Sequence, residues 1–403
     1  MDKIDKERLI DTLSELIKIP SPYFEEEQIM EFAYAWLNKR NIPVEKHHYY
    51  EDKITKFKGT NITGIIDSGE KGPIIYLNGH LDTVKLCNGW TVSPYEAIVK
   101  DGNMYGLGSL DMKCGCAIIM EVLAEFISNV KDFKGKIIYH LVSDEEGPFG
   151  LGTTYLINDK KIEKADMAII TEPSAGFAGV KSPSISLGAR GGYNYTINVY
   201  GKSSHAAAPE LGINALVDAS KIVCELEKIP MKLDDKLVSG SHCLINMTGG
   251  GNACSVPDFA QIEVFRHIVR GENRDTIENE VKEAIANANI KSKVEFEFRG
   301  SPAENFDGGF LPYIVEEDNF YVKKLQSAIN KASGEDASIT YFRSIGDFNN
   351  IGGKLGIPTI IFGPEGNNYH SFDENVNLNS VYETAQAIYY FLIDILEAKL
   401  RRN

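Results

Sequence analysis

Several features are scarce or absent in this 403-residue sequence. No apolar run reaches the length of a membrane-spanning helix, and no segment is of low complexity. The six cysteines lack the spacing of a disulfide framework, which predicts reduced thiols in a cytoplasmic protein. Residues 1–22 carry apolar side chains at helical spacing with charges between them, so they predict an amphipathic helix rather than a signal peptide. No membrane partner is therefore expected.

Basic charge is also scarce. Lysine and arginine number 42 against 57 aspartates and glutamates, and the net charge is −15. A nucleic acid or an anionic membrane would require a basic face, so neither is expected as a partner. The chain does have length and apolar content, since 43% of its 403 residues are hydrophobic. A chain of this length is longer than one hydrophobic core usually accommodates, which predicts two domains, or one domain that carries an insertion.

The order of apolar runs indicates how the chain is divided. In residues 1–183 and again in 300–403, strand-like runs such as PIIYLNGHLDT and GKIIYHLV alternate with helical ones. Strands that are apolar on both faces predict an α/β domain with a mostly parallel sheet flanked by helices. Residues 184–299 instead show the order β-α-β-β-α-β. We therefore predict an α/β catalytic domain in two parts, interrupted by an inserted α+β domain.

Residues 143–150, SDEEGPFG, place three acids directly after the apolar run IIYHLV. Carboxylates this close raise one another's pKa and lower the stability of the fold. Such a cluster is therefore expected mainly where it binds a cation or transfers a proton. Taken alone, the cluster is still more typical of a solvated loop whose acids cap the next helix.

Other side chains that bind metals follow the ends of further predicted strands, where ligands collect in open parallel sheets. Each has an ordinary explanation by itself, as a core histidine, a helix cap or a turn residue. Together they combine imidazole with carboxylate and no thiolate, which suits two zinc ions, or similar cations, that share one carboxylate. The predicted metal ligands are His80, Asp111, Glu146, Glu172 and His370.

We predict a division of roles within this group. Asp111 is the natural bridge between two cations. Asp82 stands two residues after His80, on the same strand face, where its carboxylate can accept the second imidazole N–H. Glu145 points away from Glu146, because neighbours on an extended strand diverge, and is expected to take a proton from the attacking water.

Six motifs occur in order over nearly the whole chain: GHLDT, GLGSLDMK, DEEGPFG, TEP, GKSSHAAAPELGINA and FGPEGNNYHSFDE. Together they resemble the dinuclear zinc amidohydrolase and peptidase family, which includes acetylornithine deacetylase, succinyl-diaminopimelate desuccinylase, aminoacylase and carboxypeptidase G. The resemblance implies a zinc-exopeptidase-like fold with residues 184–299 as a lid or dimerisation domain. It implies the same five metal ligands, with Glu145 as general base and acid and Asp82 holding His80. It also implies a homodimer in which His205 reaches the oxyanion of the tetrahedral intermediate.

The family divides at the position of Glu172. Members that resemble dipeptidases and tripeptidases tend to carry aspartate there, whereas deacylases and carboxypeptidase-like members carry glutamate. The resemblance therefore favours removal of an acetyl or succinyl type of group from an N-acylated amino acid. A dipeptidase or carboxypeptidase that cuts short peptides at the same site stays open, as does a catalytically silent scaffold that binds amino-acid-like ligands. The implied cofactors are two divalent metal ions, zinc first, with cobalt or manganese as alternatives.

The predicted substrate-binding residues depart from the family's pattern. Cys254 occupies the place of an asparagine that grips substrate, with Asn252 two residues earlier. His267 stands where an arginine usually meets the substrate carboxylate, and Arg266 precedes it on the opposite strand face. A strand bulge, a weaker contact from His267 or a different substrate would each explain this, and we favour the bulge.

Overall fold

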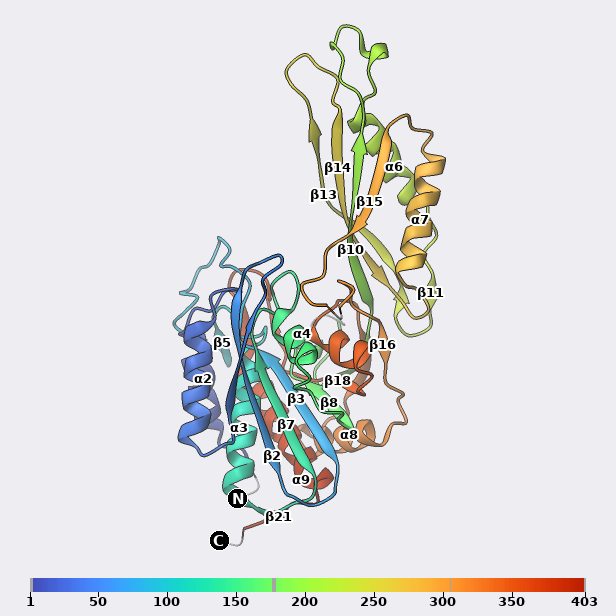
Figure 1. Ribbon diagram of the computed structural model, residues 1–403. Coiled ribbons are helices and arrows are strands. Elements are labelled where there is room, and N and C mark those ends of the chain that lie inside the picture. Colours follow the sequence, from blue (N-terminus) through green and yellow to red (C-terminus); the bar gives the residue numbers. More distant parts are fainter. Residues whose placement is uncertain (1–2, 176–178, 305, 402–403) are drawn as a thin grey trace. The chain divides into compact units, whose positions relative to one another are not determined.

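The chain divides into two compact units (Figure 1). The structure, a computed structural model, describes residues 3–175, 179–304 and 306–401. Met1–Ala189, Pro302–Asn305 and Ile314–Asn403 form an α/β unit, and Arg190–Ser301 with Phe306–Tyr313 form an α+β unit. We predicted that the insertion starts at residue 184, but the α+β unit begins at Arg190. The reason is that Ser184–Ala189 form a strand of the α/β unit.

A nine-stranded sheet forms the centre of the α/β unit. Its order is β1-β2-β7-β3-β8-β18-β9-β16, and β17 pairs with β9. The central strands β7, β3, β8 and β18 are parallel, whereas β1 and β2, which sequence analysis did not predict, join antiparallel. The strands are β1 (Glu45–Tyr50), β2 (Lys58–Asp67), β3 (Ile74–His80), β7 (Lys136–Val142), β8 (Met167–Ile170), β9 (Ser184–Ala189), β16 (Tyr313–Ile314), β17 (Ser338–Phe342) and β18 (Thr359–Ile361).

Helices pack against this sheet, which confirms the predicted α/β fold. Helices α1, α3, α9 and α8 contact one another in that order, and α3 contacts β3. Helix α3 is buried along most of its length, and its Glu121 is satisfied by Arg8 and Thr12 of α1. No helix in the described part of the chain is long and apolar enough to cross a membrane. The helices are α1 (Lys6–Ile17), α2 (Glu27–Lys39), α3 (Lys113–Asn129), α4 (Leu151–Asn158), α8 (Phe320–Ser333), η2 (Asn349–Lys354) and α9 (Leu378–Ile395).

Two small sheets complete the α/β unit. One has the order β19-β20-β5-β4, and the other pairs β21 with β6. The first sheet joins the chain that precedes the predicted ligand Asp111 to the segments on either side of the predicted ligand His370. The strands are β4 (Ile98–Lys100), β5 (Asn103–Tyr105), β6 (Val130–Asp132), β19 (Gly366–Asn367), β20 (Asn375–Asn377) and β21 (Lys399–Leu400).

The α+β unit is a four-stranded antiparallel sheet, ordered β13-β14-β10-β15, with two long helices. Along the chain its main elements follow the predicted order β-α-β-β-α-β. They are β10 (Gly191–Tyr200), α6 (Ala215–Leu226), β13 (Ser241–Gly250), β14 (Phe259–Ile268), α7 (Arg274–Asn287) and β15 (Lys293–Phe298). A short helix η1 (Pro209–Leu211) and the hairpin of β11 (Leu233–Asp234) and β12 (Val238–Ser239) are additional.

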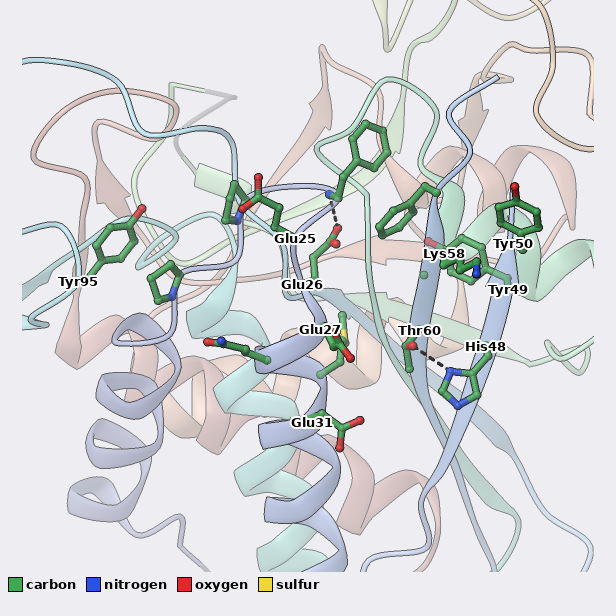
Figure 2. A pocket seen from close by; sticks show the side chains of 17 residues that line it. Glu25, Glu26, Glu27, Glu31, His48, Tyr49, Tyr50, Lys58, Thr60 and Tyr95 are labelled. Carbon is green, nitrogen blue, oxygen red and sulfur yellow. Dashed lines mark hydrogen bonds between the residues drawn. The ribbon is translucent and has the colours of Figure 1, made fainter. Parts of the chain in front are cut away.

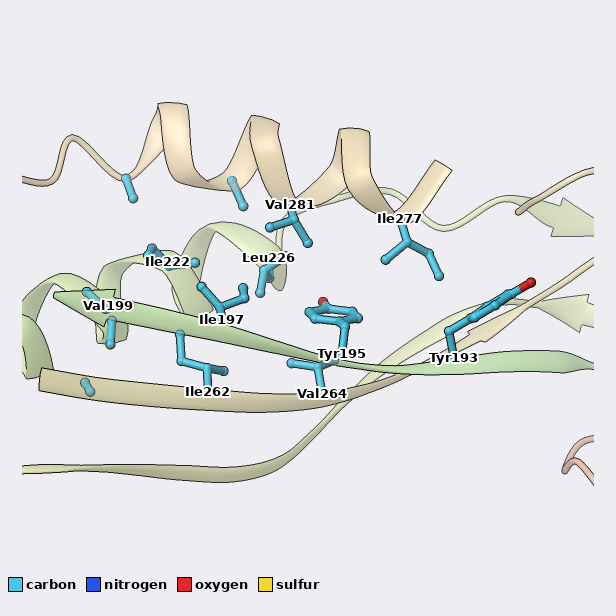
Figure 3. Close-up of a cluster of buried hydrophobic side chains, with 14 of the residues drawn as sticks. Tyr193, Tyr195, Ile197, Val199, Ile222, Leu226, Ile262, Val264, Ile277 and Val281 are labelled. Carbon is cyan, nitrogen blue, oxygen red and sulfur yellow. The ribbon is translucent and has the colours of Figure 1, made fainter. Parts of the chain in front are cut away.

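One face of this sheet supplies the core of the α+β unit (Figure 3). Buried and less buried residues alternate along β14, as expected for a sheet with one covered face. Tyr195 and Ile197 of β10 and Val264 of β14 pack against Leu226 of α6 and Val281 of α7. The unit therefore has its own hydrophobic core.

Candidate metal centre

Three neighbouring strands end at one point of the large sheet. His80 is the last residue of β3, Glu145 and Glu146 follow β7, and Glu172 follows β8. Strand β3 lies between β7 and β8 and is parallel to both, so the carboxyl ends of all three strands meet at one edge. The strand order thus brings together side chains that are up to 92 residues apart in the sequence.

Two loops add the remaining predicted ligands. Asp111 lies just before α3, and His370 lies between β19 and β20. Nε2 of His80 is 3.3 Å from Oδ1 of Asp111 and 3.2 Å from Oε1 of Glu172. Nε2 of His370 is 3.3 Å from Oδ2 of Asp111 and 2.8 Å from Oε1 of Glu146. All five side chains predicted to bind metal therefore lie in one cluster, which we call the carboxylate–histidine cluster.

Asp111 occupies the middle of this cluster. One of its oxygens faces His80 and the other faces His370. Asp111 is 7% exposed, so little water can reach its carboxylate to form hydrogen bonds. A carboxylate that presents its two oxygens to two separate donor groups has the geometry required of a bridge between two cations.

The donor atoms fit divalent cations. Two overlapping sets, His80 with Asp111 and Glu146, and His80 with Glu145 and Glu172, each have ligand atoms within 4.8 Å of one another. Nε2 of His80 is buried and has no hydrogen-bond partner among the described residues. Buried polar atoms are rarely left unsatisfied, so this orphaned nitrogen is a sign that an ion belongs there. Imidazole and carboxylate ligands without thiolate suit zinc and similar ions.

The pKa values of the side chains in the cluster also indicate that it is stabilised by positive charge. Burial raises the pKa of Glu145 well above its usual range, that of Glu146 to about 7 and that of Glu172 to about 8. Burial alone would lower the pKa of His80, but the carboxylates around it, Glu172 first, raise it. Hydrogen bonds to Asp111 and Glu146 raise the pKa of His370 to about 11. Protons therefore neutralise the cluster when cations do not.

Asp82 is also at this edge, and its carboxylate faces Nδ1 of His80, as predicted. The nearest acceptor for Nδ1 of His80 is the main-chain carbonyl of Asp82, at 3.1 Å, while the Asp82 carboxylate is 3.5 Å away. The carboxylate also accepts the main-chain N–H groups of Glu145, at 3.1 Å, and Glu146, at 2.9 Å. Asp82 thus fixes the main chain of the acidic pair, and its backbone orients His80.

A separate pocket of about 1140 Å³ lies between α2, β1 and β2 of the same unit (Figure 2). None of the predicted site residues lines it. Glu26 does, and this buried carboxylate accepts the N–H groups of Phe24 and Asp144, each at 3.0 Å. Glu26 therefore supports the residue just before Glu145. The sequence does not distinguish Glu26, because one acid within EEE at a helix start is typical of a solvated cap.

The other predicted site residues belong to the α+β unit and are not part of the cluster. His205 is exposed, and its Nδ1 accepts the N–H of Ala207 at 3.1 Å. Asn252 is exposed in the loop between β13 and β14. Their predicted roles in substrate binding and oxyanion stabilisation stay predictions.

The structure corrects the prediction for Arg266. Its side chain is fully buried, and its guanidinium donates to Glu272 and to Glu280, each at 2.7 Å from Nη2. It is therefore committed to two internal carboxylates and is not presented to a substrate. The predicted bulge is also wrong, because the register of β14 against β10 runs without a shift through this position. The irregularity of this sheet lies in β13 instead, at Leu244 and Asn246.

His267 remains on the opposite face of β14 from Arg266. Its Nδ1 is 3.3 Å from the hydroxyl of Ser241, and burial lowers its pKa to about 4. A neutral imidazole there can offer a hydrogen bond but not a full positive charge.

Comparisons with known proteins agree with this architecture. Succinyl-diaminopimelate desuccinylase of Hydrogenovibrio crunogenus is 26% identical over 336 residues, which cover 82% of this chain and 85% of that protein. A tripeptidase structure from Staphylococcus aureus superposes with a TM-score of 0.76 at 22% identity and covers 98% of this chain and 99% of its own. A dinuclear metal-binding M20 peptidase from Bacillus subtilis gives a TM-score of 0.70 at 14% identity, with coverage of 98% and 99%.

These structural likenesses show the fold, and a family model decides the relationship. The model described as peptidase family M20/M25/M40 matches residues 76–394, which include every residue of the carboxylate–histidine cluster. The match confirms the resemblance seen in the six sequence motifs. The chain therefore belongs to peptidase family M20/M25/M40 and is a hydrolase.

Proposed function

We propose that this chain is a metal-dependent amidohydrolase that removes an acetyl or succinyl type of group from an N-acylated amino acid. Two divalent cations, zinc first and cobalt or manganese as alternatives, would be held by His80, Asp111, Glu146, Glu172 and His370. Cations held there would supply Lewis acidity and make water a nucleophile at neutral pH.

One observation carries this proposal. Asp111 directs one oxygen toward His80 and the other toward His370, at 3.3 Å in each case. Glu172 lies beside His80, and Glu146 lies beside His370. Each histidine thus has its own terminal carboxylate and shares the central one, an arrangement that supports a pair of cations with Asp111 as the bridge.

Glu145 is the proposed general base and acid. Its Oε1 accepts the N–H of Asp347 at 3.1 Å, which fixes the side chain, and its Oε2 lies 3.9 Å from Nε2 of His80. The second oxygen is therefore at the edge of the cluster and free of a strong hydrogen bond within it. From there Glu145 can take a proton from attacking water and return it to the leaving amine.

The choice between acyl group and peptide rests on two supports. Glu172 is the residue type that deacylases of this family tend to carry, and the sequence relative reported above is named a desuccinylase. The tripeptidase structure favours the second candidate, a peptidase that acts on short unblocked peptides at the same site. Both candidate activities act on small-molecule substrates, either N-acyl amino acids or short peptides.

A substrate panel distinguishes the two candidates. Metal-stripped protein is supplied with zinc, cobalt or manganese separately and is assayed on N-succinyl and N-acetyl amino acids and on unblocked dipeptides and tripeptides. The proposal predicts a higher kcat/KM for the N-acyl amino acids. Faster cleavage of unblocked peptides would establish the peptidase instead, and inactivity on every amide with metal bound would favour a silent scaffold.

The α+β unit is proposed to act as a lid and dimerisation domain, with His205 reaching the oxyanion. The exposed position of His205 leaves its ring accessible, which supports such a contact. Light scattering of the purified chain should give the mass of a homodimer, and His205→Ala should lower kcat far more than it raises KM.

A further inference from the structure

Glu374 is a buried carboxylate that the proposed function does not use. It lies four residues after His370 and is 1% exposed. Its Oε2 accepts the main-chain N–H of Gly108 at 2.8 Å. Its Oε1 accepts the N–H of Leu110 at 2.8 Å and that of Asp111 at 2.9 Å. Both carboxylate oxygens are therefore committed to the loop that presents Asp111.

Much of the main-chain hydrogen bonding of this loop is to Glu374. Gly108 has a φ of 78°, in the left-handed region, and Met112 at the start of α3 makes no side-chain capping hydrogen bond. N–H groups that precede a helix have no helical carbonyl to bond. The main-chain carbonyl of Glu374 also accepts the N–H of Gly106, at 3.0 Å. One residue thus holds the loop from its first turn to Asp111.

We propose that Glu374 is a positioning residue, which fixes this loop so that the oxygens of Asp111 face the two histidines before any cation binds. The inference rests on the proposed role of Asp111 as a metal ligand. Asp82 holds the other ligand loop in the same way, through the N–H groups of Glu145 and Glu146. Ligands that are oriented in advance bind metal more tightly, because binding does not have to order them.

The hydrogen bonds require a carboxylate rather than any polar side chain. Both oxygens of Glu374 are acceptors, so a glutamine would turn its amide N–H₂ group toward a main-chain N–H. Glu374→Gln keeps the size of the side chain but breaks part of this set of hydrogen bonds from main-chain N–H groups. The substitution therefore tests acceptance of hydrogen bonds rather than packing.

Glu51 offers a matched control in the same unit. Its carboxylate also accepts three main-chain N–H groups, those of Lys53, Ile54 and Thr55. It lies in the loop after β1, which carries none of the proposed metal ligands. Glu51→Gln therefore disturbs an equivalent set of hydrogen bonds away from the cluster.

The test is a cobalt(II) titration of metal-stripped full-length protein, followed by the visible absorption spectrum and by competition with a chelator. Glu374→Gln should weaken cobalt affinity about 10–100-fold and alter the spectrum, whereas Glu51→Gln should keep wild-type values. Unchanged affinity and spectrum in Glu374→Gln would overturn the inference. Wild-type protein that does not bind two cobalt ions would overturn the proposed function, and this inference with it.

A second measurement needs no variant. In metal-free wild-type protein, the amides of Gly108, Leu110 and Asp111 should exchange their hydrogens slowly, because each is bonded to a buried carboxylate. Exchange of these three amides at the rate of an unstructured peptide would overturn the inference even if Glu374→Gln did not fold.

Discussion

Replacing Glu145 by glutamine separates its proposed chemistry from its place in the structure. The amide carbonyl of glutamine can keep the hydrogen bond that Oε1 now accepts from the N–H of Asp347. The amide nitrogen would take the place of Oε2, at 3.9 Å from Nε2 of His80, where no strong hydrogen bond is lost. The fold and cation binding should therefore survive, while the ability to accept a proton is removed.

The size of the effect follows from this loss. Positioned general bases contribute roughly 10²–10⁴-fold to a rate, so kcat should fall by about that factor, which adds about 2.7–5.5 kcal/mol to the barrier. The assay measures initial rates on the best substrate of the panel, together with cobalt affinity and thermal denaturation. Glu27→Gln, an exposed position on α2, is the control and should match the wild type.

Two outcomes would contradict the role of Glu145. Activity of Glu145→Gln within about tenfold of wild type, with metal bound, would show that another group accepts the proton. Loss of cation binding together with activity would instead make Glu145 a metal ligand, as its proximity to His80 and Glu172 permits.

Three further predictions concern the buried charges. Arg266→Met should destabilise the protein by about 3–5 kcal/mol in urea denaturation, because Glu272 and Glu280 lose their partner; a raised KM with unchanged stability would instead restore Arg266 as a substrate ligand. Since burial raises the pKa of Glu146 to about 7 and of Glu172 to about 8, cation binding must displace protons. Affinity should therefore rise from about pH 6 to about pH 8, and calorimetry in buffers of different ionisation enthalpy should detect proton release; affinity independent of pH would contradict this. Removal of cations by a chelator should lower the thermal denaturation temperature, and an unchanged temperature would argue against cations in the folded state.

The cluster was predictable because it follows from topology. Apolar runs identify β3, β7 and β8, and the rule that ligands collect at strand ends points to His80, Glu146 and Glu172 without any knowledge of distances. The alternation of helices and strands gives the α/β fold in the same way. Strands β1 and β2 were not predicted, because their polar and aromatic residues form no continuous apolar run.

The hydrogen bonds around the cluster were not predictable in this way. The partners of Arg266 come from a turn and from α7, and only the folded register shows that they surround it. The carboxylate of Asp82 was expected near His80, but the closer main-chain carbonyl of Asp82 was not predictable, since the two acceptors differ by a few tenths of an ångström in distance. Glu374 follows Asp373 in a loop, and no sequence period marks a residue whose partners lie in another loop.

The proposed function depends most on two cations sharing Asp111. X-ray diffraction from a crystal of the cobalt- or zinc-loaded protein, measured at the absorption edge of the metal, locates such ions directly. We predict two anomalous peaks on either side of Asp111, one beside His80 and Glu172 and the other beside His370 and Glu146. A single peak, or peaks away from these residues, would contradict the proposed pair of cations bridged by Asp111.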